Sequence, residues 1–163
     1  MGRKILFAGL GIFSIFSAAV IGSLAMNRPM LLSPPGPFPR LIHYLRYNTA
    51  ETSDRPMLPE LQQRRYGIPA EEIIDQIEPA IEDLPRWGLV KKEPSVGVFS
   101  ATVRSRLLGY RDDLSIMVID GPDGVTDVYL HSASRIGRGD LGANRAHILE
   151  FYEALERRLV SAE

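Results

Sequence analysis

The stretch His131-Ser-Ala-Ser-Arg-Ile-Gly-Arg-Gly-Asp-Leu-Gly-Ala-Asn144 decides the fold, because a strand-like run ends in it and a helical pattern begins directly after it. Glycine permits backbone angles that other residues resist, and charged side chains form strong hydrogen bonds. The stretch therefore has the composition of a tight turn from strand to helix. Its glycines and charged residues are Gly137, Gly139, Gly142, Arg135, Arg138 and Asp140.

Two interpretations of this loop follow from its composition. In the structural interpretation, Asp140 caps the last helix and Arg135 pairs with a carboxylate of a neighbouring loop. In the chemical interpretation, backbone N–H groups and the helix N-terminus bind a small anion. The structural interpretation is favoured, because structural ion pairs also produce such clusters. The candidate residues are Arg111, Asp112, Asp113, Ser132, Ser134, Arg135, Gly137, Arg138, Asp140, Gly142 and Asn144.

The same residues resemble the signature of a known family. The pattern Ser-Ala-Ser-Arg-x-Gly-x-x-Asp-Leu-Gly-x-Asn over residues 132–144, with the Arg111-Asp112-Asp113 turn before it, is similar to that of domain-of-unknown-function family 1499. The resemblance extends over residues 68–160 and continues after Asn144 with Arg145 and Ile148. Many members open the domain with a cysteine-containing segment, whereas this chain has no cysteine. The resemblance implies a boundary and a fold, but no established activity.

Length, charge and cysteine content exclude several classes of function. A chain of 163 residues holds one modest domain with appendages. Its net charge of −1 gives no general basic surface, so no nucleic-acid partner is expected. Without cysteine there is no disulfide and no thiolate catalysis. Because His43, His131 and His147 are scattered, the sequence predicts neither a metal site nor any other cofactor.

Residues 1–26 have the composition of a transmembrane anchor. Ile5 to Met26 contains no charged residue, and these 22 residues would span about 33 Å as a helix, enough for a hydrocarbon core. A cleaved signal peptide is the alternative, because Arg3-Lys4 precedes the run and Ser23-Leu-Ala25 fits a cleavage site.

The anchor also predicts a location and a packing face. A short basic N-terminus before an apolar run is typical of a signal anchor, which places the chain in the inner membrane with its C-terminal domain on the periplasmic side. Small residues recur every four positions at Ser14, Ala18 and Gly22. Such a stripe allows close approach of another transmembrane helix.

Residues 27–67 are predicted to be a proline-rich tether. Residues 27–69 contain eight of the twelve prolines, which favours extended chain over continuous helix. Within the tether, residues 38–47 interleave aromatic side chains with Arg40, His43 and Arg46. This segment is a candidate for the headgroup zone of a membrane or for a partner's surface, and equally for a short helix packed on its own domain.

Residues 68–163 are predicted to form a two-layer α+β domain in the order helix, four-stranded antiparallel sheet, helix. Apolar residues at helical spacing define the two helices, and short turns between alternating runs indicate a meander. The predicted helices are Pro69–Leu84 and Leu141–Val160, and the predicted strands are Leu89–Glu93, Val96–Leu107, Leu114–Asp120 and Val125–Ser132.

Alternation along the strands assigns one sheet face to the helices and leaves the other open. The inward face would carry Phe99, Ala101, Val103, Leu107, Leu114, Ile116, Val118, Val128 and Leu130. The open face is more apolar than solvent alone requires, so it is the candidate partner face. Its candidate contact residues are Val98, Arg104, Arg106, Met117, Ile119 and Tyr129.

The sequence therefore predicts a membrane-anchored, non-enzymatic interaction module, an accessory subunit of a larger inner-membrane complex whose partners are other membrane-protein subunits. No catalytic residue is assigned, because Ser132 and Ser134 do not lie in a nucleophile-elbow sequence. The alternative is a domain that binds a small anion, or an enzyme, using loop 131–144.

Overall fold

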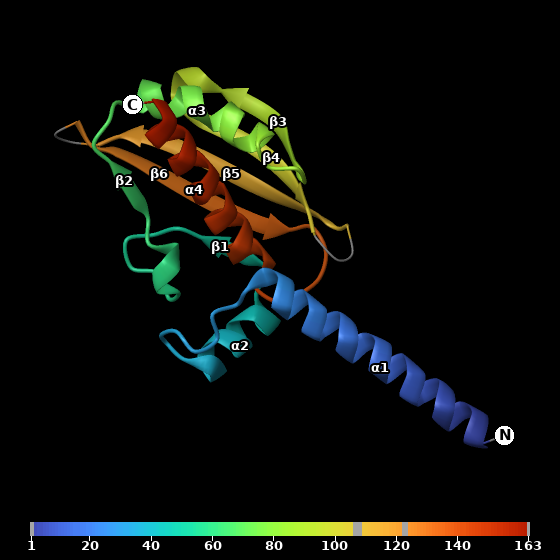
Figure 1. Cartoon of the computed structure of the whole chain (residues 1–163). Helices are drawn as coiled ribbons and strands as arrows, with labels where there is room; N and C mark the ends of the chain where they lie inside the picture. The colour runs from blue at the N-terminus through green and yellow to red at the C-terminus, as the bar shows by residue number, and fades with distance from the viewer. Residues whose placement is uncertain (1, 106–108, 122–123, 163) are drawn as a thin grey trace.

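One antiparallel sheet with two helices against the same face forms the folded part of the chain (Figure 1). The computed structural model describes residues 2–105, 109–121 and 124–162, without the side chains of residues 2–6, 8–10, 12, 13, 15, 16 and 162. Its helices are α1 (Gly2–Asn27), α2 (Pro37–Arg46), α3 (Ala70–Glu82) and α4 (Ala143–Ala162), with 3₁₀ turns η1 (Pro59–Leu61) and η2 (Pro94–Val96). Its strands are β1 (Thr49–Glu51), β2 (Arg64–Tyr66), β3 (Trp87–Glu93), β4 (Val98–Arg104), β5 (Arg111–Asp120) and β6 (Thr126–Ser134).

The sheet has six strands in the described chain, rather than the predicted four. Its order is β1-β6-β5-β4-β3, with β2 also paired to β6, and every pair is antiparallel. The meander from β3 to β6 is the predicted one, but β5 begins at Arg111, so the predicted turn at residues 111–113 is part of the strand. Thr49 of β1 lies opposite Ala133, and Arg64 of β2 lies opposite Val128, so both short strands line the free edge of β6. Strands of three residues are too short to show alternation in the sequence.

The prediction that residues 27–67 form an extended tether is wrong. This segment contains α2, η1, β1 and β2, and its Tyr44, Leu58 and Leu61 are part of the hydrophobic core. Proline does not prevent these elements, because Pro37 and Pro59 stand in the first turn of α2 and η1, where a missing N–H costs no helical hydrogen bond. The domain therefore begins well before residue 68.

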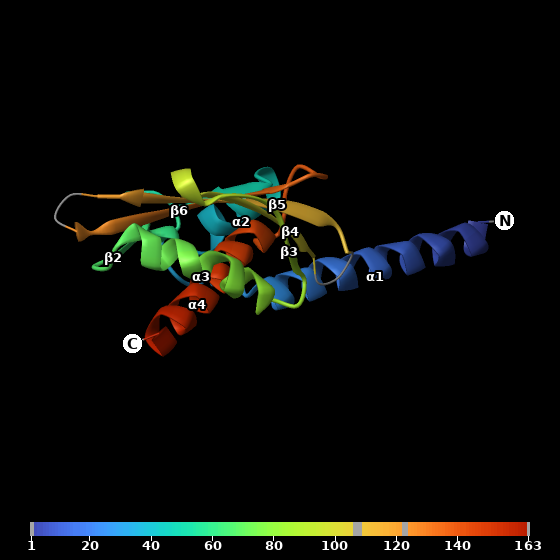
Figure 2. The same ribbon diagram turned by 90° about the horizontal axis from the view of Figure 1, so that it is seen from above.

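The core lies between the sheet and the helices α3 and α4, which lie on the same side of the sheet (Figure 2). The predicted strand register is confirmed for the described residues, since the inward side chains of β4, β5 and β6 are at most 4% exposed. Leu107 was also assigned to this face, but it lies outside the described residues. The core residues on the sheet are Phe99, Ala101, Val103, Leu114, Ile116, Val118, Val128 and Leu130.

Helix α1 projects from one end of the domain (Figure 1), and its last residue, Asn27, donates a hydrogen bond to Leu141 O at 3.1 Å. Among the described residues, no helix is long and apolar enough to cross a membrane, so the predicted anchor at 1–26 has no support there. In the predicted packing stripe, Ser14 and Ala18 are exposed and Gly22 is half-buried.

Candidate functional site

The loop between β6 and α4, residues 135–142, packs against α2. Leu141 N donates to Tyr44 O at 3.2 Å, and the side chain of Asn48, just after α2, donates to Gly137 O at 2.9 Å. A Cβ atom added to Gly139 would lie 2.7 Å from Tyr44 O, closer than real Cβ contacts. The loop is therefore a docking surface for α2, and Gly139 is required by close backbone approach.

Asp140 occupies the N-terminus of α4. Its Oδ1 accepts a hydrogen bond from Gly142 N and its Oδ2 accepts one from Asn144 N, each at 2.8 Å. The chain enters the helix through Leu141 and Gly142, which have φ angles of 52° and 82°. Burial raises the pKa of Asp140 above its usual range against these hydrogen bonds. The carboxylate therefore already accepts hydrogen bonds from the backbone amides that a bound anion would need as donors.

Asn144 joins three segments inside the protein, where it is fully buried. Its Nδ2 donates to Asn48 O at 2.6 Å and to Ser134 Oγ at 2.9 Å, and its Oδ1 accepts from Ser132 Oγ at 2.7 Å. Ser132, Ser134 and Asn144 therefore connect β6, α4 and the chain after α2. These hydrogen bonds are made inside the protein, so they satisfy buried polar groups and do not present them to a ligand in solvent.

Arg135 forms a two-point ion pair with Asp113 of β5. Its Nε and Nη2 donate to the two carboxylate oxygens at 2.9 and 2.6 Å. Both side chains are about half exposed, at 48% and 50%. Arg111 and Arg138 are also exposed. Arg135 and Arg138 of the loop and Arg111 of β5 thus lie on the surface, and Arg135 is already paired.

Asp112 has a different environment from Asp113, because it faces the interior and is 2% exposed. Its Oδ2 lies 3.7 Å from Nδ1 of His147 on α4, and the indole of Trp87 lies edge-on to the His147 ring. Burial raises the pKa of Asp112 to about 6, against a hydrogen bond from Ser134. Nothing in the sequence indicated that His147 or Trp87 lies beside Asp112. Strand alternation could have indicated its burial, because Asp112 stands two residues before Leu114 and so points to the same, inward face of β5.

A second buried cluster of charged side chains was missed in the sequence analysis. Arg40 of α2 is fully buried and donates from both Nη atoms to Glu60 at 2.7 Å, and Arg145 of α4 donates to the same carboxylate. Burial alone would raise the pKa of Glu60, but the hydrogen bonds from the two arginines outweigh it and lower the pKa to about 2. Arg145 Nη1 also donates to Arg28 O at 3.0 Å. The cluster therefore connects α2, η1, α4 and the residue after α1.

The open sheet face carries the predicted partner residues. Val98, Met117 and Tyr129 lie side by side across β4, β5 and β6, and Ile119 follows in the next row. Met117 and Ile119 are 42% and 41% exposed. Arg104 is exposed, and Arg106 lies outside the described residues. Within the described chain, α3 and α4 cover only the opposite face (Figure 2).

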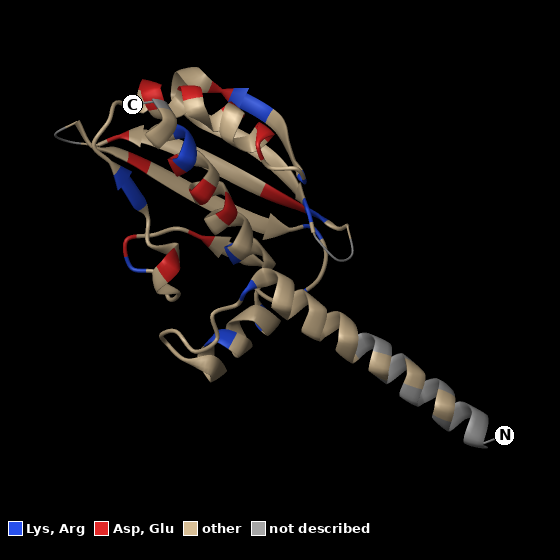
Figure 3. Cartoon of the chain, in the orientation of Figure 1, with Lys and Arg blue, Asp and Glu red and all other residues tan. Residues whose placement is uncertain are grey.

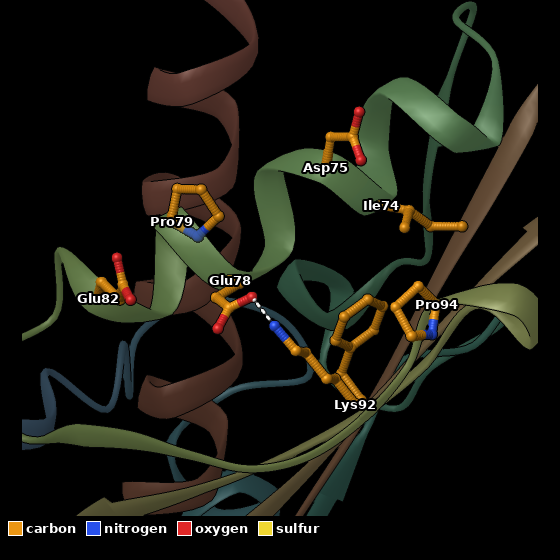
Figure 4. Close-up of a pocket in the computed structure, with 8 residues that line it drawn as sticks. Ile74, Asp75, Glu78, Pro79, Glu82, Lys92 and Pro94 are labelled. Carbon is orange, nitrogen blue, oxygen red and sulfur yellow. Dashed lines mark hydrogen bonds and ion pairs between the residues drawn. The ribbon is translucent and has the colours of Figure 1, made fainter.

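A pocket of about 410 Å³ lies between α3 and β3. Its charged side chains are paired with each other or exposed at its rim. Figure 4 shows Lys92 reaching from β3 to Glu78 of α3, with which it forms an ion pair. Asp75 and Glu82 also line the pocket and are exposed. Among the described residues, no group of histidine, cysteine or carboxylate side chains could hold a metal ion.

Three solved structures resemble the chain weakly. The crystal structure of Ara h 8.0201 has a TM-score of 0.45 at 9% identity, covering 69% of this chain and 97% of that one. CalU16 from Micromonospora echinospora has a TM-score of 0.41 at 12% identity, covering 69% and 88%. TTHA0849 from Thermus thermophilus has a TM-score of 0.38 at 10% identity, covering 71% and 99%. None of them identifies a function for this chain.

Sequence comparison identifies the family. No curated protein matches the chain at a significant level. A family model described as "Protein of unknown function (DUF1499)" matches residues 46–155, which include every strand of the sheet and most of α4. The match begins at the end of α2, earlier than the boundary at residue 68. The chain belongs to the DUF1499 family.

Proposed function

We propose that the protein is a non-enzymatic interaction module held at a membrane by α1, with its open sheet face bound to a subunit of an inner-membrane complex. The observation that carries the proposal is the apolar row on the open face. Val98, Met117 and Tyr129 form its centre, and Ile119 extends it. Interface energy concentrates in such central apolar and aromatic side chains.

The membrane location is supported by the sequence of α1. Ile5 to Met26 has no charged residue, and the helix continues over 26 residues to Asn27. With Arg3 and Lys4 at its start, the inner membrane with the folded domain on the periplasmic side is the orientation that we propose. A reporter that is active only outside the cytoplasm, fused after Glu163, should work. Activity of a reporter that works only in the cytoplasm would exclude this orientation.

The contacts give less support to an anion site or an enzyme at loop 131–144. Asp140 holds the amides at the start of α4, and Arg135 is paired with Asp113. Inorganic phosphate should therefore leave the thermal midpoint of the full chain unchanged. A saturable rise of the midpoint with phosphate would favour the anion-binding alternative.

The partner face is tested by adding charge to it. Full-length chains with Ile119→Glu or Tyr129→Glu should remain folded. The amount of subunit that co-purifies with them from native membranes should fall at least tenfold relative to the wild type. Val160→Glu is the matched control, because Val160 is an exposed apolar side chain on α4, away from the sheet face. Equal recovery of subunits by all four chains would refute the docking role of this face.

A further inference from the structure

Helix α2 buries polar side chains and exposes apolar ones, the reverse of an ordinary surface helix. Its inward residues Arg40 and Tyr44 are 0% and 1% exposed. Its outward residues form one apolar stripe at helical spacing. They are Phe38, Leu41, Ile42 and Leu45, which are 78%, 36%, 53% and 53% exposed.

The contacts of Arg40 prevent α2 from rotating to hide this stripe. Arg40 donates to Glu60 and also to Ser33 O and Pro34 O at 3.0 Å, while Tyr44 OH donates to Pro29 O at 2.8 Å. Turning the helix would separate the buried guanidinium of Arg40 from the Glu60 carboxylate, which is costly. The apolar stripe is therefore held outward by the fold itself.

We propose that α2 is an interfacial helix that lies on the surface of a lipid bilayer, with its apolar stripe at the boundary between headgroups and acyl chains. The inference rests on the membrane location proposed above, and it adds a second point of contact. An amphipathic helix with an apolar face and flanking basic and aromatic residues binds in this manner.

The position of α2 favours a bilayer as the occupant. Helix α2 starts ten residues after α1 ends, and both lie at the same end of the domain (Figure 1). The connecting chain adds Leu32, which is 91% exposed, and Met30, which is 47% exposed. The uncharged run of α1 therefore leads directly into a further apolar surface.

The charge of this segment also favours a bilayer. Residues 27–50 contain Arg28, Arg40 and Arg46 and no acidic residue. In Figure 3, α2 is coloured for basic but not for acidic residues, whereas acidic residues occur in both the helices and the strands of the sheet domain. Arg28 and Arg46 are exposed and would meet anionic headgroups. Tyr47, 54% exposed at the end of α2, suits the interfacial zone, where tyrosine is enriched.

The absence of native cysteine makes the test direct. Full-length chains carrying Leu41→Cys, Leu45→Cys or the control Val90→Cys would be labelled with a polarity-sensitive fluorophore. They would be reconstituted into phosphatidylcholine vesicles with and without phosphatidylglycerol. Val90 is a matched control because it is an apolar side chain, 64% exposed, on β3. Brominated acyl chains in the vesicles then report contact with lipid by quenching.

We expect the labels at positions 41 and 45 to be quenched several-fold more than the label at 90, and more strongly with phosphatidylglycerol present. Ile42→Glu should reduce quenching at position 41. If the chain does not float with vesicles, the membrane location itself fails, and this inference with it. If it floats but the labels at 41 and 45 stay unquenched, the α2 inference alone is refuted. A label shielded from water but unquenched by lipid would mean that a protein surface covers the stripe, which also refutes it.

Discussion

Burial gives the two arginine–carboxylate systems of this chain opposite energetic roles. Glu60 is shared by Arg40 and Arg145, whose side chains are 0% and 3% exposed. Arg135 and Asp113 form a well-shaped pair that is half exposed to water. A buried charge that loses its partner is strongly destabilising, whereas an exposed pair contributes little. Ion pairing therefore contributes more to stability at Glu60 than at Arg135 in the loop between β6 and α4.

Glu60→Gln should lower the free energy of unfolding by about 3 to 5 kcal/mol, because it leaves two buried guanidinium groups without their carboxylate. Asp113→Asn, the control, should change it little. Urea unfolding at pH 7 measures both. Equal effects of the two substitutions would contradict this assignment of roles, as would a large effect of Arg135→Ala.

The raised pKa of Asp112 leads us to expect an unusual dependence of stability on pH. Its pKa in the folded protein is about 6, above its ordinary value of 3.8, so the folded state holds the proton more tightly than the unfolded state. The stability that this proton provides is complete below pH 3.8 and is lost as the pH rises through 6. Ser134 and His147 face this carboxyl group, and Asp113 and Asp140 add negative charge near it.

Asp112→Asn should therefore remove a penalty at neutral pH and raise the free energy of unfolding by about 1 to 3 kcal/mol at pH 7. The advantage of the variant over the wild type should shrink as the pH falls from 7 to 4. Denaturant unfolding at several pH values measures this, with Asp113→Asn as a control on the same strand. A constant difference between variant and wild type across this range would show that Asp112 does not titrate in this way.

At the scale of elements, the loop and α2 depend on each other. The loop between β6 and α4 accepts α2 because Gly139 lets the two backbones meet, and α2 in turn places Tyr44 against Gly142, 3.5 Å from where a Cβ would lie. Helix α2 has 10 residues and is too short to be stable alone. Packing against the loop is therefore what stabilises α2 as a helix.

Gly139→Ala should push the loop away from α2 and destabilise the protein by several kcal/mol, because the added Cβ meets backbone atoms that cannot rotate away. Gly67→Ala is the matched control, since nothing lies within 4 Å of its Cβ position. The free energy of unfolding measures the effect, and amide hydrogen exchange in α2 should report local opening. A Gly139→Ala protein as stable as Gly67→Ala would mean that the loop adjusts freely.

At the scale of the whole molecule, β6 organises the domain. It pairs with β5 on one edge and with β1 and β2 on the other, and the last helix starts one loop after it. Residues 27–66 close the edge of β6 and supply the carboxylate for Arg145. An unpaired edge strand is a template for aggregation.

A chain shortened to begin at Ile68 should therefore not fold cooperatively, whereas one that begins at Asn27 should. The shorter chain lacks β1, β2 and Glu60, so both the edge of β6 and the buried Arg145 lose their partners. Thermal unfolding followed by circular dichroism distinguishes the two. Similar cooperative transitions would show that residues 27–67 are dispensable to the fold.

The sequence by itself determined the parts of this protein whose signal is local and periodic. Alternation at every second residue in β4, β5 and β6, and apolar spacing in α3 and α4, identified the meander, its register and its covered face. Turn chemistry identified the role of Asp140 as a helix cap. The loop residues 132–144 were also sufficient to indicate the family.

Only the tertiary structure decided what residues 27–66 do and which charges are buried. Strands β1 and β2 have three residues each and exist because β6 offers them hydrogen-bonding partners far along the chain. Arg40 and Arg145 lie far apart in the sequence, yet Glu60 brings them together. Such contacts depend on chain segments that meet only after folding, so no local period in the sequence records them. For the same physical reason, α2 could be recognised as a helix with its apolar side outward only once its buried arginine had been located.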